Sequence, residues 1–362
     1  MRLGLVIYGS LDTLSGGYLY DRMLVRELRA AGHEVLLFSL PWRSYPAHLL
    51  QNCATAFAER IVRARLDILL QDELNHPSLF WLNRSLRRRV PSPIISVVHH
   101  LRSQEDHPRP LMPLYRAVER AYLTTLDGCV YNSRTTQASV ANLVGHPLPG
   151  VVAYPAADHI QPPARASVAD LLQRRGASSA PLQLLFVGNV IQRKGLHTLV
   201  HALAALPSTH WHLHIAGSTR SDRVYVQRIQ QLARTLNLDA NLTWHGSIAN
   251  DGLRSLYSNA DILALPSYEG FGIVYLEAMA FGLPVIASTS GAAHEIVFSG
   301  KNGYLVAPDA VHTLSRHLAE LLANRSQIAV LGYNARQQYE RHATWRDSMA
   351  LALAWLHETK RG

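Results

Sequence analysis

Short apolar runs that alternate with helical periodicity constrain the fold of this 362-residue chain more than any other feature. Apolar runs of strand length lie at residues 3–8, 35–40, 93–100 and 128–133. The helical pattern after the first run places Tyr20, Met23, Leu24 and Leu28 on one helix face, and Gly32 is positioned to end that helix. Such alternation is typical of a parallel sheet with crossover helices. We therefore expect an α/β protein.

A second series of the same kind begins at residue 182 and continues to residue 288. Between the two series lies a stretch rich in Pro, Ala and Ser, at residues 161–181. We predict a domain boundary near residue 162, with a doubly wound, Rossmann-like domain over residues 1–162 and another over 163–343. Ligands of such sheets bind outside the carboxyl ends of the strands, so both domains should present their loops to a common cleft.

Composition excludes several classes of protein. Hydrophobic residues make up 48% of the chain, and no apolar run reaches the roughly 18 residues that a membrane span requires. The apolar stretch Leu3–Tyr8 has no signal-peptide cleavage pattern after it, so we expect a cytoplasmic protein. Cys53 and Cys129 lack the spacing of a disulfide framework or metal site, and both are predicted to lie in the core.

The net charge of +9 is spread over both halves of the chain, and the densest basic cluster is Arg84, Arg87, Arg88 and Arg89. The apolar residues 79–82 precede it in a short amphipathic segment. Two interpretations stay open, a solvated helix end or a peripheral contact with anionic lipid headgroups at the inner membrane surface. Nucleic acid is not expected as a partner, because no aromatic platform or recognition helix accompanies the charge.

Two loops carry residues suited to phosphate groups. Gly16 and Gly17 lead directly into the first predicted helix, where backbone amides can approach an anion, although a tight turn without a ligand would also need glycine. Gly188 follows a strand in the second series, and Arg193 with Lys194 stands before a helix. Cations at a helix start oppose the helix dipole, which favours an anionic partner such as a diphosphate leaving group.

The most informative segment is LPSYEGFGIVYLEAMAFGLPVIAS, in which a strand, a glycine-rich turn and a helix follow each other. Glu269 lies in the turn, whereas Glu277 should lie inside the helix among apolar residues. A buried carboxylate is costly unless its oxygens accept hydrogen bonds, and the vicinal hydroxyls of a ribose would supply them. The amides near Phe271 would then face the diphosphate.

Here the sequence resembles glycosyltransferase family 4, a group of retaining GT-B enzymes whose hallmark is two glutamates separated by seven residues. Glu269 and Glu277 match that hallmark. Segments such as SGGYLYDRMLV, FVGNVIQRKGLHTLV and GKNGYLVAPD follow the family order along nearly the whole chain. The resemblance implies two facing Rossmann-like domains and a helix over residues 344–362 that packs back on the N-terminal, acceptor-binding domain.

The same resemblance implies roles for particular residues. Glu269 contacts the donor sugar, and Glu277 holds the ribose. A histidine at the end of an N-domain strand lies near the transferred sugar; His99 is the first choice, and His100 stays open. The remaining donor contacts implied are the backbone amides of Gly270, Phe271 and Gly272, the diphosphate clamp of Arg193 and Lys194, and the closing loop of Gly16 and Gly17.

The implied activity is a retaining hexosyl transfer from a nucleotide diphosphate sugar, UDP before GDP, to an unidentified hydroxyl acceptor, a lipid or a saccharide. No cofactor and no metal are expected, because the acidic pairs Asp72–Glu73 and Glu105–Asp106 lie outside the donor segments. The alternatives are a sugar-nucleotide epimerase or phosphorylase of the same fold and an inactive nucleotide-sugar binding module. A phosphorylase would need a late lysine for its pyridoxal group, and Lys301 sits in a turn.

Overall fold

The computed structural model describes residues 1–105 and 107–361, so Asp106 of the second acidic pair lies outside the described residues. The chain divides into two compact units: unit 1 contains Met1–Pro155 and the segment from Ala343 onwards, and unit 2 contains Ala156–His342. The first division falls seven residues before the predicted boundary at 162. The reason is packing, because Ala156, Ala157 and Ile160 are buried in unit 2.

Unit 1 contains a six-stranded sheet whose paired strands are all parallel, in the order β2-β1-β3-β4-β5-β6. Its strands are β1 (Arg2–Tyr8), β2 (Glu34–Leu40), β3 (Ile68–Asp72), β4 (Ile94–Val98), β5 (Gly128–Tyr131) and β6 (Gly150–Val152). The strand order reverses between β1 and β3, which makes the carboxyl ends of these two strands the switch point where ligands of doubly wound sheets bind.

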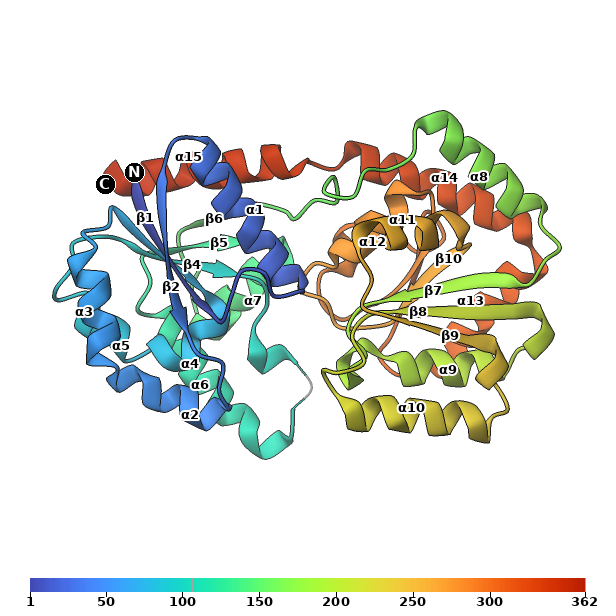
Figure 1. Ribbon diagram of the computed structural model, residues 1–362, viewed down its shortest axis with the longest axis horizontal. Coiled ribbons are helices and arrows are strands. Elements are labelled where there is room, and N and C mark those ends of the chain that lie inside the picture. The colour runs from blue at the N-terminus through green and yellow to red at the C-terminus, as the bar shows by residue number, and fades with distance from the viewer. Residues whose placement is uncertain (106, 362) are drawn as a thin grey trace. The chain divides into compact units, whose positions relative to one another are not determined.

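The helices of unit 1 cover both faces of this sheet (Figure 1). They are α1 (Gly16–Ala30), α2 (Tyr45–Leu50), α3 (Thr55–Arg63), α4 (His76–Leu79), α5 (Leu82–Leu86), α6 (Met112–Leu123), α7 (Arg134–Val144) and α15 (Trp345–Arg361). The Ser15 side chain caps α1, and the predicted apolar face of that helix is buried. The C-terminal helix α15 packs on α1 and β6 (Figure 1).

Unit 2 contains a second parallel sheet, in the order β12-β11-β10-β7-β8-β9. Its strands are β7 (Leu182–Val187), β8 (Trp211–Ala216), β9 (Leu242–Gly246), β10 (Ile262–Leu265), β11 (Val285–Ser288) and β12 (Gly303–Val306). Numbered within the unit, this is the 3-2-1-4-5-6 order of a dinucleotide-binding sheet, with its switch point between β7 and β10.

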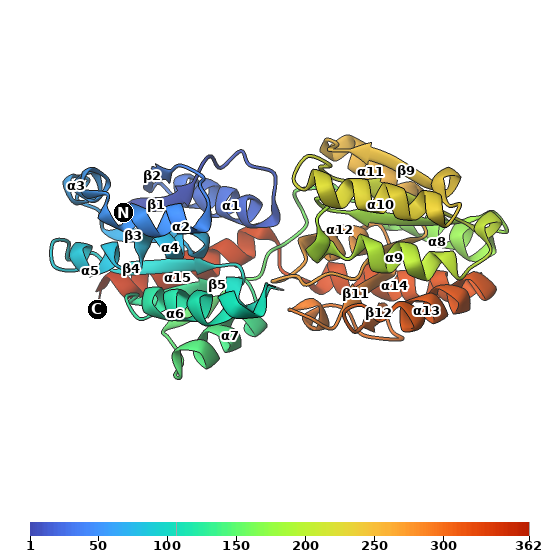
Figure 2. The ribbon, with the colours of Figure 1, turned by 90° about the horizontal axis from the view of Figure 1, so that it is seen from below.

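Two groups of helices enclose this second sheet (Figure 2). The helices of unit 2 are α8 (Arg165–Ala177), α9 (Leu196–Ala204), α10 (Arg223–Thr235), α11 (Asn250–Asn259), α12 (Ile273–Ala280), α13 (Val311–Ala323) and α14 (Arg325–Arg341). One group packs α9 against α10 and α13, and the other packs α14 against α8 and α12.

Two further sequence predictions can be compared with the structure. No helix in the described part of the chain is long and apolar enough to cross a membrane. Cys129 is buried as predicted, but the prediction for Cys53 is wrong. Cys53 ends a short 3-10 turn between α2 and α3 and is exposed, because that turn buries Asn52 instead.

Candidate functional site

The loops after β7 and β10 meet at the switch point of unit 2. Gly188 follows β7, and the 3-10 turn Gln192–Lys194 leads to Gly195, whose φ is +70°. A Cβ at residue 195 would lie 2.6 Å from the Pro266 carbonyl oxygen, so glycine is what lets the two loops pack together. A Cβ at Gly188 would lie 3.5 Å from the Lys194 side chain. The predicted residues Gly188 and Lys194 are therefore neighbours.

A cluster of charged groups lies where these loops meet. Arg193 donates from Nη1 to the Tyr268 carbonyl oxygen at 2.7 Å. Lys194 donates from Nζ to Glu269 Oε1, and Ser267 Oγ donates to the same carboxylate oxygen at 2.5 Å. Burial alone would raise the pKa of Glu269, but the Lys194 and Arg193 cations hold it below its ordinary value. Glu269 therefore carries its charge, and two cations face one carboxylate.

The turn after this cluster leads into α12. Gly272 is the residue before the helix and has a φ of +93°, and a Cβ there would lie 2.3 Å from the Tyr275 ring. The first N–H groups of a helix have no acceptor within the helix, so the start of α12 adds donors beside the two cations. Phe271 is buried, and its ring lies 5.6 Å from that of His342.

Glu277 lies one turn into α12, as predicted, and only 7% of the residue is exposed. Tyr257 donates from its hydroxyl to Glu277 Oε2 at 2.7 Å, and His159 Nε2 lies 3.1 Å from Oε1. Burial, together with the Glu277 charge, raises the pKa of Tyr257, so this hydroxyl stays a donor. Each carboxylate oxygen has two lone pairs, so both retain acceptor capacity for a ligand.

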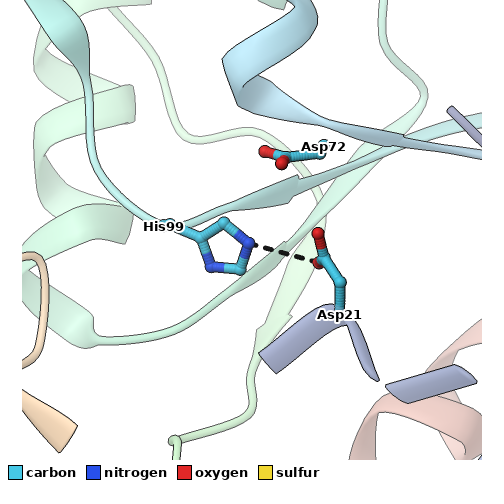
Figure 3. Close-up of side chains that lie close together, drawn as sticks. All are labelled: Asp21, Asp72 and His99. Atoms are coloured by element: carbon cyan, nitrogen blue, oxygen red, sulfur yellow. Dashed lines mark hydrogen bonds and ion pairs between the residues drawn. The ribbon is translucent and has the colours of Figure 1, made fainter. Parts of the chain in front are cut away.

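Unit 1 gathers a second set of buried ionisable groups at the carboxyl ends of its strands. Figure 3 shows Asp21 of α1 and His99 after β4 pointing toward one another, with Asp72 of β3 close by. His99 Nε2 lies 3.2 Å from Asp21 Oδ1. Asp21, Asp72 and His99 are all buried, with exposed fractions of 0%, 2% and 7%. The predicted His99 therefore lies in a charged cluster, and its Asp21 partner was not predicted.

The electrostatics of this cluster favour a charged imidazole. Burial alone would lower the pKa of His99, but Asp21 and, more weakly, Asp72 and Glu73 raise it to about 9. Burial and the Asp21 charge raise the pKa of Asp72. His100, the alternative candidate, instead lies 2.9 Å from Glu105 through its Nε2.

The predicted Gly17, and Asn132 after β5, both contact His99. Gly16 is the first residue of α1, and Gly17 packs against the imidazole, where a Cβ would lie 3.2 Å from His99 Cδ2. Asn132 donates from Nδ2 to the His99 carbonyl oxygen at 2.7 Å. Ser133 caps α7 by accepting from the Thr136 N–H.

Among the described residues, two groups have the spacing of metal ligands, and both lie in unit 1. One is Asp21, Asp72 and His99, and the other is Glu73, His76 and Glu119. Neither group contains a residue of the Arg193, Lys194 and Glu269 cluster in unit 2.

The arginine cluster after α5 is partly used within unit 1. Arg87 pairs with Asp127 at 2.8 Å, and Arg89 pairs with Glu59 at 2.6 Å. Arg84 stacks over the Trp81 ring at 5.1 Å, and this tryptophan is 58% exposed. Two of the four arginines therefore form partly exposed ion pairs within unit 1.

Comparisons with known proteins agree with this fold. Residues 169–338 match the family described as Glycosyl transferases group 1. A sucrose-phosphate synthase from Thermosynechococcus elongatus has a similar structure, with a TM-score of 0.80, 24% identity and coverage of 99% of this chain and 98% of that chain. The structure of Anabaena Alr3699/HepE in complex with UDP-glucose gives a TM-score of 0.75 at 19% identity, covering 99% of each chain.

One curated relative is a GDP-mannose-dependent alpha-(1-6)-phosphatidylinositol monomannoside mannosyltransferase of Mycobacterium tuberculosis. It is 30% identical over an alignment of 255 residues that covers 67% of this chain. The match spans 65% of that relative's length. The two doubly wound units thus define a protein of the GT-B class. Residues 169–338, within unit 2, belong to the group 1 glycosyl transferases, and the resemblance to family 4 is confirmed.

Sequence reasoning missed the residues that hold the predicted ones. Tyr257 and His159 contact Glu277 from segments outside the motif. Ser267, which donates to Glu269, lies two residues before it in the same segment. Asp21 could have been found, because it stands three and seven residues before Leu24 and Leu28, on the buried face of α1. A charged residue on such a face needs a partner.

Proposed function

We propose that this chain is a retaining hexosyltransferase that uses a nucleotide diphosphate sugar and a hydroxyl acceptor. The observation that carries the proposal is the cluster of Arg193, Lys194 and Glu269 at the switch point of unit 2. The family match of this chain supports the same activity. So do the nucleotide sugars named for a relative and for a structural neighbour, GDP-mannose and UDP-glucose. The nucleotide of the donor is proposed to be UDP in the first place and GDP in the second.

In this proposal the donor site divides into three parts. Arg193 and Lys194 bind the diphosphate and offset the negative charge that develops on it as it leaves. Glu269 accepts hydrogen bonds from sugar hydroxyls in place of its bond from Lys194. Glu277 accepts from the ribose hydroxyls, with Tyr257 holding the carboxylate in place.

The proposed reaction needs no cofactor or metal. The acceptor oxygen forms a bond to the anomeric carbon while the bond from that carbon to the phosphate oxygen breaks. The electron pair of the broken bond goes to the phosphate, which takes the proton of the attacking hydroxyl on the same face of the sugar. The fixed cations of unit 2 supply the charge stabilisation that a metal would otherwise give.

The test is a mass-spectrometric screen of nucleotide sugars against pools of saccharide and lipid acceptors, with EDTA and without. Transfer that survives EDTA, with an anomeric configuration retained by NMR, is the expected result. Interconversion of the donor sugar without transfer would identify an epimerase. Binding with neither hydrolysis nor transfer would identify a nucleotide-sugar binding module.

We also propose that unit 1 contacts anionic membrane surfaces through Trp81 and the arginine cluster. Leu50 is 77% exposed and lies two residues before Asn52. The Trp81 N–H donates to Asn52 Oδ1 at 2.8 Å, so the segments that carry the exposed Leu50 and Trp81 side chains are in contact. The phosphatidylinositol monomannoside in the name of the mycobacterial relative fits such a surface.

Binding to vesicles containing anionic lipid tests this surface. The variant with serine at Arg87, Arg88 and Arg89 should lose most of its vesicle binding, each charge contributing about 1 kcal/mol near the surface. A serine at exposed Arg223 of unit 2 is the matched control. Unchanged partitioning of the triple variant would exclude the membrane contact.

A further inference from the structure

The buried cluster of Asp21, His99 and Asp72 contains a contact that the proposed donor chemistry does not use. His99 Nε2 is bound to Asp21, whose carboxylate is fully buried. Asp21 Oδ2 is buried without a hydrogen-bond partner among the described residues, so this carboxylate depends on His99 for its compensation. A buried anion with one partner is stable only if that partner is a cation or a strong donor.

The other side of the imidazole is open. His99 Nδ1 has no hydrogen-bond partner among the described residues, and it does not belong to their fully buried, unpaired polar atoms. The rest of the ring is fixed, because Gly17 packs on Cδ2 and the Tyr20 ring meets it edge-on at 5.2 Å. Nδ1 is therefore the one ring nitrogen that can reach a ligand.

We propose that Asp21 is a positioning residue that holds the His99 imidazole doubly protonated, so that Nδ1 always offers an N–H to a substrate hydroxyl or phosphate oxygen. The inference rests on the proposed transfer function. A neutral imidazole bound to Asp21 through its Nε2–H would leave Nδ1 as an acceptor instead. The charge state set by Asp21 thus decides whether His99 donates or accepts.

Three elements place carboxylates around His99, and these carboxylates favour the doubly protonated imidazole. Asp21 acts from α1, Asp72 from β3 and Glu73 from the turn after β3, and all three raise the pKa of His99. Among these three carboxylates Asp21 has the largest effect on the pKa of His99, and burial raises the pKa values of Asp72 and Glu73 themselves. His100, the adjacent ring, is engaged with Glu105.

The first test is an NMR titration of His99 in the unmodified protein, with labelled histidine. His99→Gln identifies the signal among the 19 histidines. The expected midpoint is about 9, and Asp21→Asn, which keeps the shape but removes the charge, should lower it to the ordinary value of 6.5 or below. Asp72→Asn is the matched control and should lower it less.

The second test is the pH profile of transfer. If the pKa of His99 falls from about 9 to about 6.5, its charged fraction at pH 8 falls from about 0.9 to about 0.03. Asp21→Asn should therefore lower kcat about 30-fold at pH 8 and less than about twofold at pH 6, with the KM for the donor unchanged. A merely structural role would lower activity equally at both pH values.

Three outcomes would overturn the inference. One is a wild-type His99 midpoint below 7, and another is a pH-independent effect of Asp21→Asn. The third is stoichiometric binding of Zn²⁺ or Mn²⁺ at His99 that Asp21→Asn abolishes, which would make the cluster a metal site. A midpoint near 9 in a protein without transfer activity would instead refute the proposed function alone.

Discussion

Removing the charge of Glu269 tests the donor cluster of unit 2. Glu269→Gln leaves Lys194 and Arg193 without their carboxylate, and breaking a buried ion pair by removing one partner costs about 3–5 kcal/mol. The Lys194 and Glu269 side chains are 14% and 13% exposed, so the low end, about 3 kcal/mol, is expected. Because the pKa of Glu269 lies below its ordinary 4.5, this stabilisation is complete above pH 4.5 and is lost as the pH falls through the folded-state value.

Hydrogen exchange measured on peptides of β7 and β10 is the appropriate assay, because a chain of two units need not unfold in one step. The opening free energy of these strands should fall by about 3 kcal/mol at pH 7. Glu320→Gln, which removes an exposed pair with Arg316 in the same unit, should change it by less than about 0.5 kcal/mol. Equal exchange in the two variants would refute the reasoning.

Three further outcomes follow from the same contacts. In Glu269→Gln, Lys194 is released from the carboxylate, so calorimetry should show a nucleotide diphosphate bound as tightly as before or several-fold more tightly, although transfer falls. Tyr257→Phe removes a hydrogen bond to buried Glu277 worth about 1.5–3 kcal/mol. The KM for the donor should therefore rise by a larger factor than kcat falls. A lowered kcat with a constant KM would contradict this. Gly272→Ala should speed exchange in α12, whereas Gly252→Ala in α11, where the nearest atom is 3.6 Å away, should not.

Much of unit 2 was predictable from sequence because its information is local. The apolar runs, Gly188, the adjacent cations and the two glutamates lie in two continuous segments, each a strand followed by a turn and a helix. Parallel strands bring such turns to one edge of a sheet. What the sequence could not give was the direct pairing of Lys194 with Glu269, which are 75 residues apart.

Unit 1 was predicted less completely, for physical reasons. The strand β3 was missed because its run ILLQD is short and ends in Asp72. All five of its residues are buried, so the alternation of buried and exposed side chains that marks many strands is absent. The carboxylate of Asp72 was therefore assigned to no site. His159 precedes Glu277 by 118 residues in the segment that joins the units, and no local pattern connects them. Such partners are set by tertiary packing alone.

The most direct test of the donor site is a crystal structure of the protein with a nucleotide diphosphate. Diphosphate oxygens are expected within hydrogen-bond distance of Arg193 and Lys194, and both ribose hydroxyls within hydrogen-bond distance of Glu277. A nucleotide bound elsewhere, with the Lys194 to Glu269 pair intact, would contradict this expectation.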